Sequence, residues 1–238
     1  MRPSENKALA LRDKVWIAME FVNGRCLHDI AKRFTFSEQL IATVIKQCLS
    51  GLAFIHRHGY IHSDIKSHNI LVSIEGKVQI ADFGLVTKTT PGQKVETEYP
   101  KGSLYWLAPE TIRSQPFDSK IDIWSLGIVC IEMIQRNPPT FNLENAAAIQ
   151  RIAEGYAELD KPTKTSRLLR RFLYKGCLRK NPNKRLSAED LLQHSFIQLQ
   201  AMPVWCLREL MEGVMVHVPP YRKKRKPNIF QRLVRRNP

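Results

Sequence analysis

The longest regular pattern of apolar and polar positions lies between Thr35 and Gly59. Thr35-Phe36-Ser37-Glu38 is a capping-box pattern, in which a hydroxyl and a carboxylate satisfy free backbone groups of a first helical turn. Apolar side chains then recur at helical spacing, namely Leu40, Ile41, Val44, Ile45, Cys48, Leu49, Leu52 and Ile55. Because Gly59 is a typical C-terminal stop, the pattern predicts one long scaffold helix that delivers the loop after it.

A second helix is predicted to be buried on all sides. The segment Ile121–Ile134 reads IDIWSLGIVCIEMI and is apolar on nearly every face, with Asp122 as a polar exception near its start. Further amphipathic helices are expected over Asn142–Gly155, Thr165–Leu178 and Ser187–Leu199. From Met202 onward the periodicity fades, so residues 200–238 are predicted to be an extended or disordered tail.

Strands are few and short. Val15–Phe21 is one apolar run, and Ile70–Ser73 and Val78–Ala81 are two more with a Glu-Gly turn between them. Pairing residue 70 with 81 and residue 73 with 78 closes a hairpin, and this register sets Asn69 and Asp82 side by side, with about 5 Å between their backbones. The expected fold class is α+β and mainly α, a helical lobe with a small β-hairpin.

The excess of positive charge, +15 in all, lies largely at the C-terminal end of the chain. Tyr221–Pro238 carries eight Lys and Arg and no acidic residue, which leaves 29 basic and 22 acidic residues for the body. The basic tail predicts binding to a nuclear import receptor or to an acidic surface, with a solvated tail as the alternative. A role in binding nucleic acid rests on the charge alone.

Composition narrows the cellular setting. The five cysteines are scattered and never in CxxC spacing, which predicts reduced thiols and a cytoplasmic or nuclear location. No apolar run approaches the ~18 residues that a membrane span needs, so no transmembrane segment is expected.

Two polar clusters flank the predicted hairpin, HSDIKSHN at residues 62–69 and DFG at residues 82–84. The amide oxygen of Asn69 and the carboxylate of Asp82 can share a hard cation such as Mg²⁺, and Asp64 is a free carboxylate on the same loop. The pattern H-x-D-x-K-x-x-N followed by D-F-G resembles the catalytic centre of a protein kinase. GSLYWLAPE at 102–110 and DIWSLG at 122–127 are further matches.

The segments IHSDIKSHNILV, IDIWSLGI and LLQHSF most resemble the corresponding segments of the PAK-like serine/threonine kinases of the sterile-20 group. The resemblance implies ATP and Mg²⁺ as cofactors, and transfer of the γ-phosphate to Ser or Thr of protein substrates. It implies that Asp64 accepts the proton of the acceptor hydroxyl and that Lys66 offsets charge on the γ-phosphate. Ser103 would contact both side chains, and Asn69 and Asp82 would hold the metal.

The same resemblance implies a nucleotide site and three structural roles. Met19 falls at the gatekeeper position, the backbones of Glu20 and Val22 would hydrogen-bond the adenine, and Leu71 would lie beneath the base. In the structural roles, Asp122 would bind the backbone of the catalytic loop and Arg185 would pair with Glu110. His62 and Phe83 would be packing residues. His68 has no implied role and is expected at the surface.

The sequence departs from the family pattern before Val15, where no GxGxxG, strand lysine or regulatory-helix glutamate is present. Residues 1–14 are therefore expected to be a remnant or linker, and residues 15–199 a truncated kinase domain of hinge and large lobe. The chain alone is expected to be weakly active or inactive. The alternative is a non-catalytic, pseudokinase-like protein that holds kinase substrates or partners.

Two departures concern regulation. Ser63 stands where the family has an arginine, so phosphorylation of Thr97 or Tyr99 would lack its usual anchor. Ser103-Leu104 replaces a Thr-Pro pair but keeps the hydroxyl. We therefore expect the chemistry of the loop to be retained and its control by phosphorylation to be altered.

Overall fold

A computed structural model of the protein describes residues 7–11, 14–90 and 92–217. These residues form an α+β fold that is mainly helical, as predicted. Their strands pair in small antiparallel sheets, which are β1 (Lys7–Leu11) with β2 (Lys14–Ala18), β3 (Gly24–Cys26) with β5 (Ile70–Ser73) and β6 (Val78–Ile80), and β4 (Tyr60–Ile61) with β7 (Thr87–Lys88).

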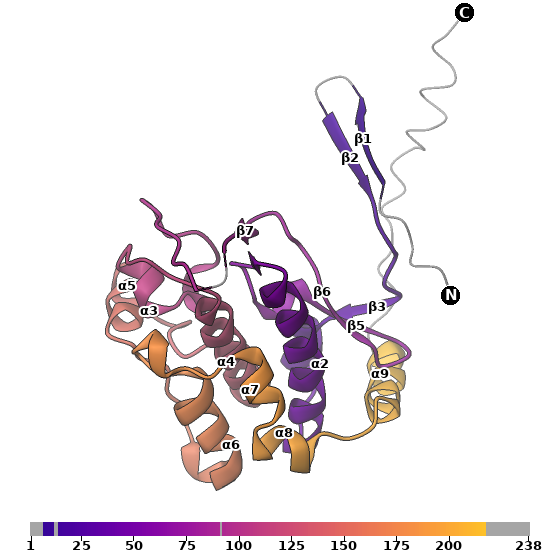
Figure 1. Cartoon of the computed structure of the whole chain (residues 1–238). Helices are drawn as coiled ribbons and strands as arrows, with labels where there is room; N and C mark the ends of the chain where they lie inside the picture. The colour runs from indigo at the N-terminus through magenta and orange to yellow at the C-terminus, as the bar shows by residue number, and fades with distance from the viewer. Residues whose placement is uncertain (1–6, 12–13, 91, 218–238) are drawn as a thin grey trace, which may run out of the picture.

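Helices make up the body of the lobe. They are α1 (Leu27–Arg33), α2 (Glu38–Arg57), α3 (Pro109–Ile112), α4 (Lys120–Gln135), α5 (Asn145–Ala153), α6 (Arg167–Arg171), α7 (Ala188–Leu192), α8 (Ser195–Gln200) and α9 (Trp205–His217). Figure 1 shows α2 and α4 side by side at the centre, with α7 and α8 packed against α2. The β1–β2 hairpin projects from the end of the molecule opposite α6.

The central helix α2 forms where the longest sequence pattern predicts it. Its apolar stripe is buried. The N-terminal cap is Ser37, whose side chain accepts a hydrogen bond from the Leu40 amide. Thr35, the first residue of the capping-box pattern, lies outside the helix. By length and composition α2 is the one described helix that could cross a membrane, but half of it is buried inside the lobe. It is therefore the core helix of this fold.

Helix α4 is buried on nearly every face, as its sequence predicts. It ends at Gln135 and is capped by Arg136, which adopts a left-handed conformation with φ of 71°. The three amphipathic segments are helical over shorter ranges: α5, α6 continued by a π-helical turn at Phe172–Cys177, and α7 followed by α8. The break between α7 and α8 arises where His194 begins a new helix by accepting from the Phe196 amide.

The hairpin after the catalytic loop forms, but its predicted register is wrong by one residue. Ile70 pairs with Ile80 rather than with residue 81, and the Ala81 amide donates to the Asn69 carbonyl. The turn decides the register, because Gly76 has φ of +81° and its amide donates to the Ser73 carbonyl. The apolar alternation also favours the observed register, because Ile70 and Val72 then share a face with Ile80 and Val78.

The stretch predicted to be a remnant or linker, residues 1–14, contains a strand that the sequence pattern did not predict. Residues 7–11 form strand β1, which pairs with β2 from Lys7 opposite Ala18 to Leu11 opposite Lys14. The predicted strand Val15–Phe21 is shorter than expected, since β2 ends at Ala18. The alternation in KALAL is weak because two of its positions are alanines, so the pattern does not predict a strand there.

The predicted tail from residue 200 is wrong over its first part. Helix α9 packs Leu207, Met211 and Val214 into the core against β5 and α2. These residues recur at helical spacing, and Gly76 lets the hairpin turn approach them, because a Cβ there would lie 2.5 Å from the Val204 carbonyl oxygen. The basic run at residues 222–226 lies outside the described residues.

We expect Leu207→Ala or Met211→Ala to lower the free energy of unfolding by about 2–5 kcal/mol, because each leaves a cavity in a packed core. Urea denaturation followed by circular dichroism measures the change. The matched control is Val216→Ala, whose side chain is 81% exposed on the same helix and should change stability by less than about 0.5 kcal/mol. Equal effects at buried and exposed positions would show that α9 does not belong to the folded unit.

Candidate active site

A buried carboxylate at the start of α4 binds the backbone of the catalytic loop. Asp122, at the start of α4, accepts the backbone amides of His62 and Ser63 at 2.9 Å each, and His56 of α2 lies 2.8 Å from the same carboxylate. Ser63 has φ of 68°, a left-handed conformation that costs energy in a non-glycine residue. The contact predicted for Asp122 is present, and it anchors the strained turn that precedes Asp64.

Four groups converge on Asp64. Its Oδ1 accepts from the backbone amide of Ser103 at 3.0 Å and from the Ser103 hydroxyl at 2.8 Å. Its Oδ2 accepts from Lys66 Nζ at 2.7 Å and from Asn69 Nδ2 at 3.0 Å. Lys66 Nζ also donates to Ser103 Oγ at 2.7 Å. The structure thus brings Asp64, Lys66 and Ser103 together, from a loop and a segment 39 residues apart.

The surroundings keep Asp64 ionised. Burial alone would raise the pKa of this carboxyl, but the hydrogen bonds from Lys66 and Ser103, the charge of Lys66 and the hydrogen bond from Asn69 together lower it below its ordinary value. An ionised carboxylate held by a lysine and a hydroxyl can accept a proton from an incoming alcohol and orient its oxygen.

Gly102 allows the segment of Ser103 to approach this closely. It has φ of +113°, and a Cβ on it would lie 2.7 Å from the Ser63 carbonyl oxygen. The sequence signal was present, since Gly102 opens the GSLYWLAPE match, but its role was not inferred. Any side chain here would push the Ser103 hydroxyl away from Asp64.

The two predicted metal ligands leave the hairpin close to the loop but not as direct neighbours. In the observed register Asn69 lies opposite Ala81, and Asp82 follows with φ of 64° and an exposed side chain. Asn69 donates from its side-chain Nδ2 to Asp64, so its side-chain Oδ1 is available to a metal. Asp82 Oδ1 accepts only from the Gly84 amide at 3.3 Å among the described contacts. An amide oxygen and a carboxylate fit the preference of Mg²⁺.

The residues predicted to contact the adenine are less closely grouped than the residues around Asp64. Met19 is 68% exposed, Glu20 is exposed and Val22 is half-buried, all on the irregular stretch between β2 and β3. Leu71 is half-buried on β5 opposite Cys26. Within the described residues no side-chain hydrogen bond fixes Met19 or Glu20, so these positions remain predictions.

A second buried carboxylate joins four elements beside the loop. Glu132 of α4 is fully buried and accepts from the Ser67 hydroxyl at 2.7 Å, from Trp106 Nε1 at 3.2 Å and from His28 Nδ1 at 3.0 Å. Sequence reasoning missed this cluster. His28 precedes Glu132 by 104 residues, and no local pattern marks the pair.

Arg185 and Glu110 form the predicted ion pair, and both side chains are buried. The guanidinium donates from Nη1 to Oε1 at 2.5 Å and from Nη2 to Oε2 at 2.7 Å. Arg185 also stacks over Trp124, with 5.0 Å from the guanidinium carbon to the ring centroid. This bidentate pair ties the end of the 102–110 segment to the base of the lobe.

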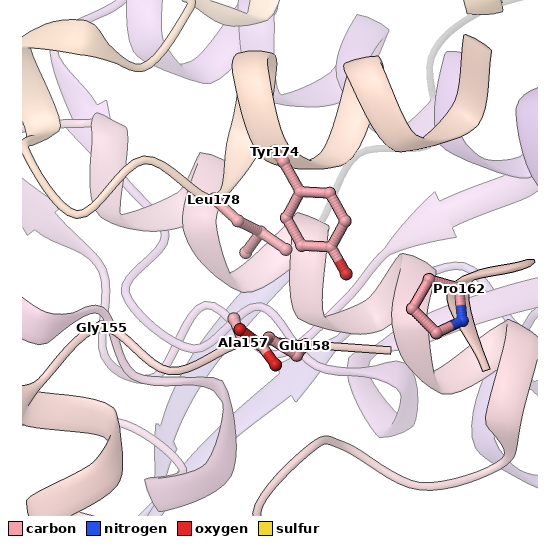
Figure 2. A pocket seen from close by; sticks show the side chains of 6 residues that line it. All are labelled: Gly155, Ala157, Glu158, Pro162, Tyr174 and Leu178. Carbon is pink, nitrogen blue, oxygen red and sulfur yellow. The ribbon is translucent and has the colours of Figure 1, made fainter. Parts of the chain in front are cut away.

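Two cavities lie away from Asp64. Figure 2 shows one of about 420 Å³, where Tyr174 and Leu178 face Ala157, Glu158 and Pro162. The Tyr174 hydroxyl accepts from the Leu159 amide at 3.0 Å, so its polar end is already satisfied. Neither this cavity nor a second of about 410 Å³ beside the start of α2 shares a residue with the catalytic loop.

Comparison with known proteins identifies this arrangement. Residues 6–197 match the family model described as protein kinase domain, so the chain belongs to the protein kinase family. It is similar to serine/threonine-protein kinase PAK 1 of Mus musculus, with 41% identity over 202 residues that cover 84% of this chain and 36% of that protein. The predicted resemblance to PAK-like kinases is confirmed.

Two further relatives agree. Serine/threonine-protein kinase PAK mbt of Drosophila melanogaster is 39% identical over 213 residues, covering 87% of this chain and 32% of that protein. Serine/threonine-protein kinase PAK 5 of Rattus norvegicus is 39% identical over 209 residues, covering 86% and 28%. The chain spans about a third of the length of the curated relatives it matches. None of these comparisons favours the non-catalytic alternative.

Proposed function

We propose that this protein is a PAK-type serine/threonine kinase that transfers the γ-phosphate of ATP to Ser or Thr hydroxyls of protein substrates. The observation that carries the proposal is the joint contact of Asp64, Lys66 and Ser103, with distances of 2.7–2.8 Å among the three side chains. The acceptor hydroxyl would take the place that Ser103 Oγ holds beside Asp64. The names of the PAK relatives support the choice of Ser and Thr acceptors.

The roles of the side chains follow from this geometry. Asp64, ionised at neutral pH, would orient the acceptor oxygen and take its proton. Lys66 would turn its ammonium from the carboxylate toward the transferred phosphoryl group and offset its charge. Bound Mg²⁺ supplies charge neutralisation on the phosphates, and Asn69 and Asp82 would hold it. Asp122 would keep the loop in place throughout.

The direct test is transfer of labelled phosphate from ATP, in the presence of Mg²⁺, to a panel of protein substrates by the 238-residue chain. Phosphoamino-acid analysis should find label on Ser and Thr and none on Tyr. Label on Tyr, or equal incorporation by wild type and a variant without the Asp64 carboxylate, would overturn the proposal.

We expect MgATP to bind this chain weakly, because Met19 and Glu20, which would line the adenine site, are both exposed. With a Kd near 1 mM, ligand at 1 mM stabilises by about 0.4 kcal/mol, which raises Tm by about 1–2 °C. Differential scanning fluorimetry with MgATP, compared with ATP plus a chelator, measures the shift. A rise of several degrees at sub-millimolar MgATP would contradict weak binding.

We also propose a cytoplasmic and nuclear distribution, with the basic residues of Tyr221–Pro238 read by an import receptor or drawn to an acidic surface. Deleting residues 221–238 from a fluorescent fusion should abolish nuclear accumulation. A second variant keeps the length of the chain, replaces the five basic residues at 222–226 with glutamine, and should lose nuclear accumulation as well. An unchanged distribution in both variants would reject the role of the tail.

A further inference from the structure

Basic residues before the tail are concentrated in one stretch of the chain. Residues 161–185 contain ten Lys and Arg and no Asp or Glu. Outside this stretch and the tail at 221–238, the chain has 19 basic and 22 acidic residues. The basic excess of the body therefore belongs to a single continuous segment, which begins before α6 and ends after the π-helical turn.

Five of these cations are exposed on or just before one helix. The π-helical turn continues α6 without a break, so residues 167–177 form a single helix whose inner side is buried in the core. Its exposed cations recur four residues apart, a spacing that places them on one side of a helix. Two exposed lysines precede the helix, and both line the cavity beside α2. We call these five residues the basic face: Lys161, Lys164, Arg167, Arg171 and Lys175.

The cations of the basic face have no acidic partner within the described residues. Arg185 is the one member of the 161–185 stretch that forms an ion pair there. Glu38, the acid at the start of α6, already accepts from the amide and the hydroxyl of Ser166. Helix α8, which packs against α6, carries no acid. The exposed acids Glu158 and Asp160 precede the stretch, and they are outnumbered by the five cations.

The basic face lies at the end of the lobe away from the catalytic loop. Figure 1 shows α6 at one end of the lobe and β7 toward the other. Strand β7 pairs with β4, and β4 leads directly into the loop that carries Asp64. A partner bound to the basic face would therefore leave the acceptor position open.

This surface fits a flat anionic partner better than a nucleic-acid strand or an acidic peptide. Phe172 and Tyr174 are the aromatic residues of the stretch, and neither is exposed, so no ring is available for a base to stack on. Neither described cavity is lined by Arg167, Arg171 or Lys175, so these cations offer charge without a described pocket for a peptide side chain. The head groups of a bilayer form a continuous sheet of charge that can meet all the cations of an outward helix face together.

We propose that the basic face is a docking surface for membranes that contain anionic lipids such as phosphatidylserine. Each Lys or Arg close to such a surface raises the partition coefficient of a protein about fivefold. The basic residues at 222–236 would add to the attraction, but the proposed contact is made by the folded lobe. The inference is independent of the proposed kinase function, since neither ATP nor Asp64 takes part.

The test is sedimentation of the full chain with phosphatidylcholine vesicles that contain about 30% phosphatidylserine, at about 0.1 M salt. The chain should bind these vesicles and should not bind vesicles of phosphatidylcholine alone. About 1 M salt should release it, because the Debye length then falls to about 3 Å. Equal binding to uncharged vesicles, or binding that survives high salt, would overturn the inference.

The decisive variant removes three charges from the helix and keeps the tail. It should weaken partition to the phosphatidylserine vesicles by about 30- to 100-fold. Glutamine is a good helix former, so the fold should persist, and circular dichroism checks this. The substitutions are Arg167→Gln, Arg171→Gln and Lys175→Gln.

The matched control removes the same number of charges from exposed lysines on α2, on the turn between β5 and β6, and on the segment after β7. Partition should then change by less than about fivefold. The substitutions are Lys46→Gln, Lys77→Gln and Lys94→Gln. Equal losses in the two triple variants would reduce the effect to net charge and reject a docking face. An unchanged partition in the helix variant would assign all binding to residues outside the basic face and reject it as well.

Two competitors test the choice of partner. A double-stranded oligonucleotide and a polyglutamate peptide are added to the wild-type chain at the same concentration of negative charge as the vesicles. The chain should stay on the vesicles. If either competitor removes the chain from the vesicles, and binds the helix variant more weakly than the wild type, the basic face belongs to that class of partner and the membrane assignment is wrong.

Discussion

Replacing Glu110 with alanine is expected to lower the free energy of unfolding by about 3–5 kcal/mol, because it leaves the Arg185 guanidinium buried without a counter-charge. Both oxygens of Glu110 are used, and the arginine side chain has no exposed surface through which water could replace them. Since small domains are stable by only about 5–15 kcal/mol, the variant should be marginal at room temperature. Urea denaturation followed by tryptophan fluorescence measures the loss.

The control for this prediction is another Arg–Glu pair in the same chain. Arg208 and Glu212 form an exposed pair on α9, with 3.1 Å between Nε and Oε1 and 65% exposure of both side chains. Glu212→Ala should cost less than about 1 kcal/mol because water screens the remaining arginine. If Glu110→Ala costs no more than Glu212→Ala, the buried pair does not hold the 102–110 segment.

Asp64→Asn should reduce phosphate transfer by about 10²–10⁴-fold, because the amide can orient a hydroxyl but cannot accept its proton. Its amide can keep at least part of the contact with Ser103, so the fold should survive. Single-turnover transfer to a protein substrate measures the loss, and circular dichroism checks the fold. Asp29→Asn, at an exposed acid on α1, is the control and should retain most of the activity.

A wild-type rate in Asp64→Asn would remove Asp64 from the reaction and with it the observation that carries the proposed function. A similar loss in Asp29→Asn would point to a general effect of negative charge near the loop. The comparison matters because Asp64 has structural contacts as well, and a loss of activity with a loss of fold would not assign it a chemical role.

The fold was predictable where the apolar pattern of a single segment is enough to specify its helix. Helix α2 has an apolar stripe, and α4 is apolar all round, so both were found to within a few residues. Helix α9 has its stripe at Leu207, Met211 and Val214 but adjoins a basic, proline-containing end, and the tail composition outweighed the period. The hairpin register was missed because the prediction paired Ser73 with residue 78, whereas the turn at Gly76 is one residue tighter and the Ser73 amide donates to the Lys77 carbonyl.

The sequence by itself determined the chemical groups of the site, since Asp64, Lys66 and Asn69 lie within six residues on one loop and carry their own signature. Only the tertiary structure decided how those groups are held. Asp122 reaches the loop from 60 residues away, Ser103 from 39, and His28 meets Glu132 across 104. Such contacts depend on which helix faces pack together and not on local spacing. The stack of His28 on His68 and the bond from Ser67 to Glu132 therefore exist only because α1, α4 and the loop pack side by side.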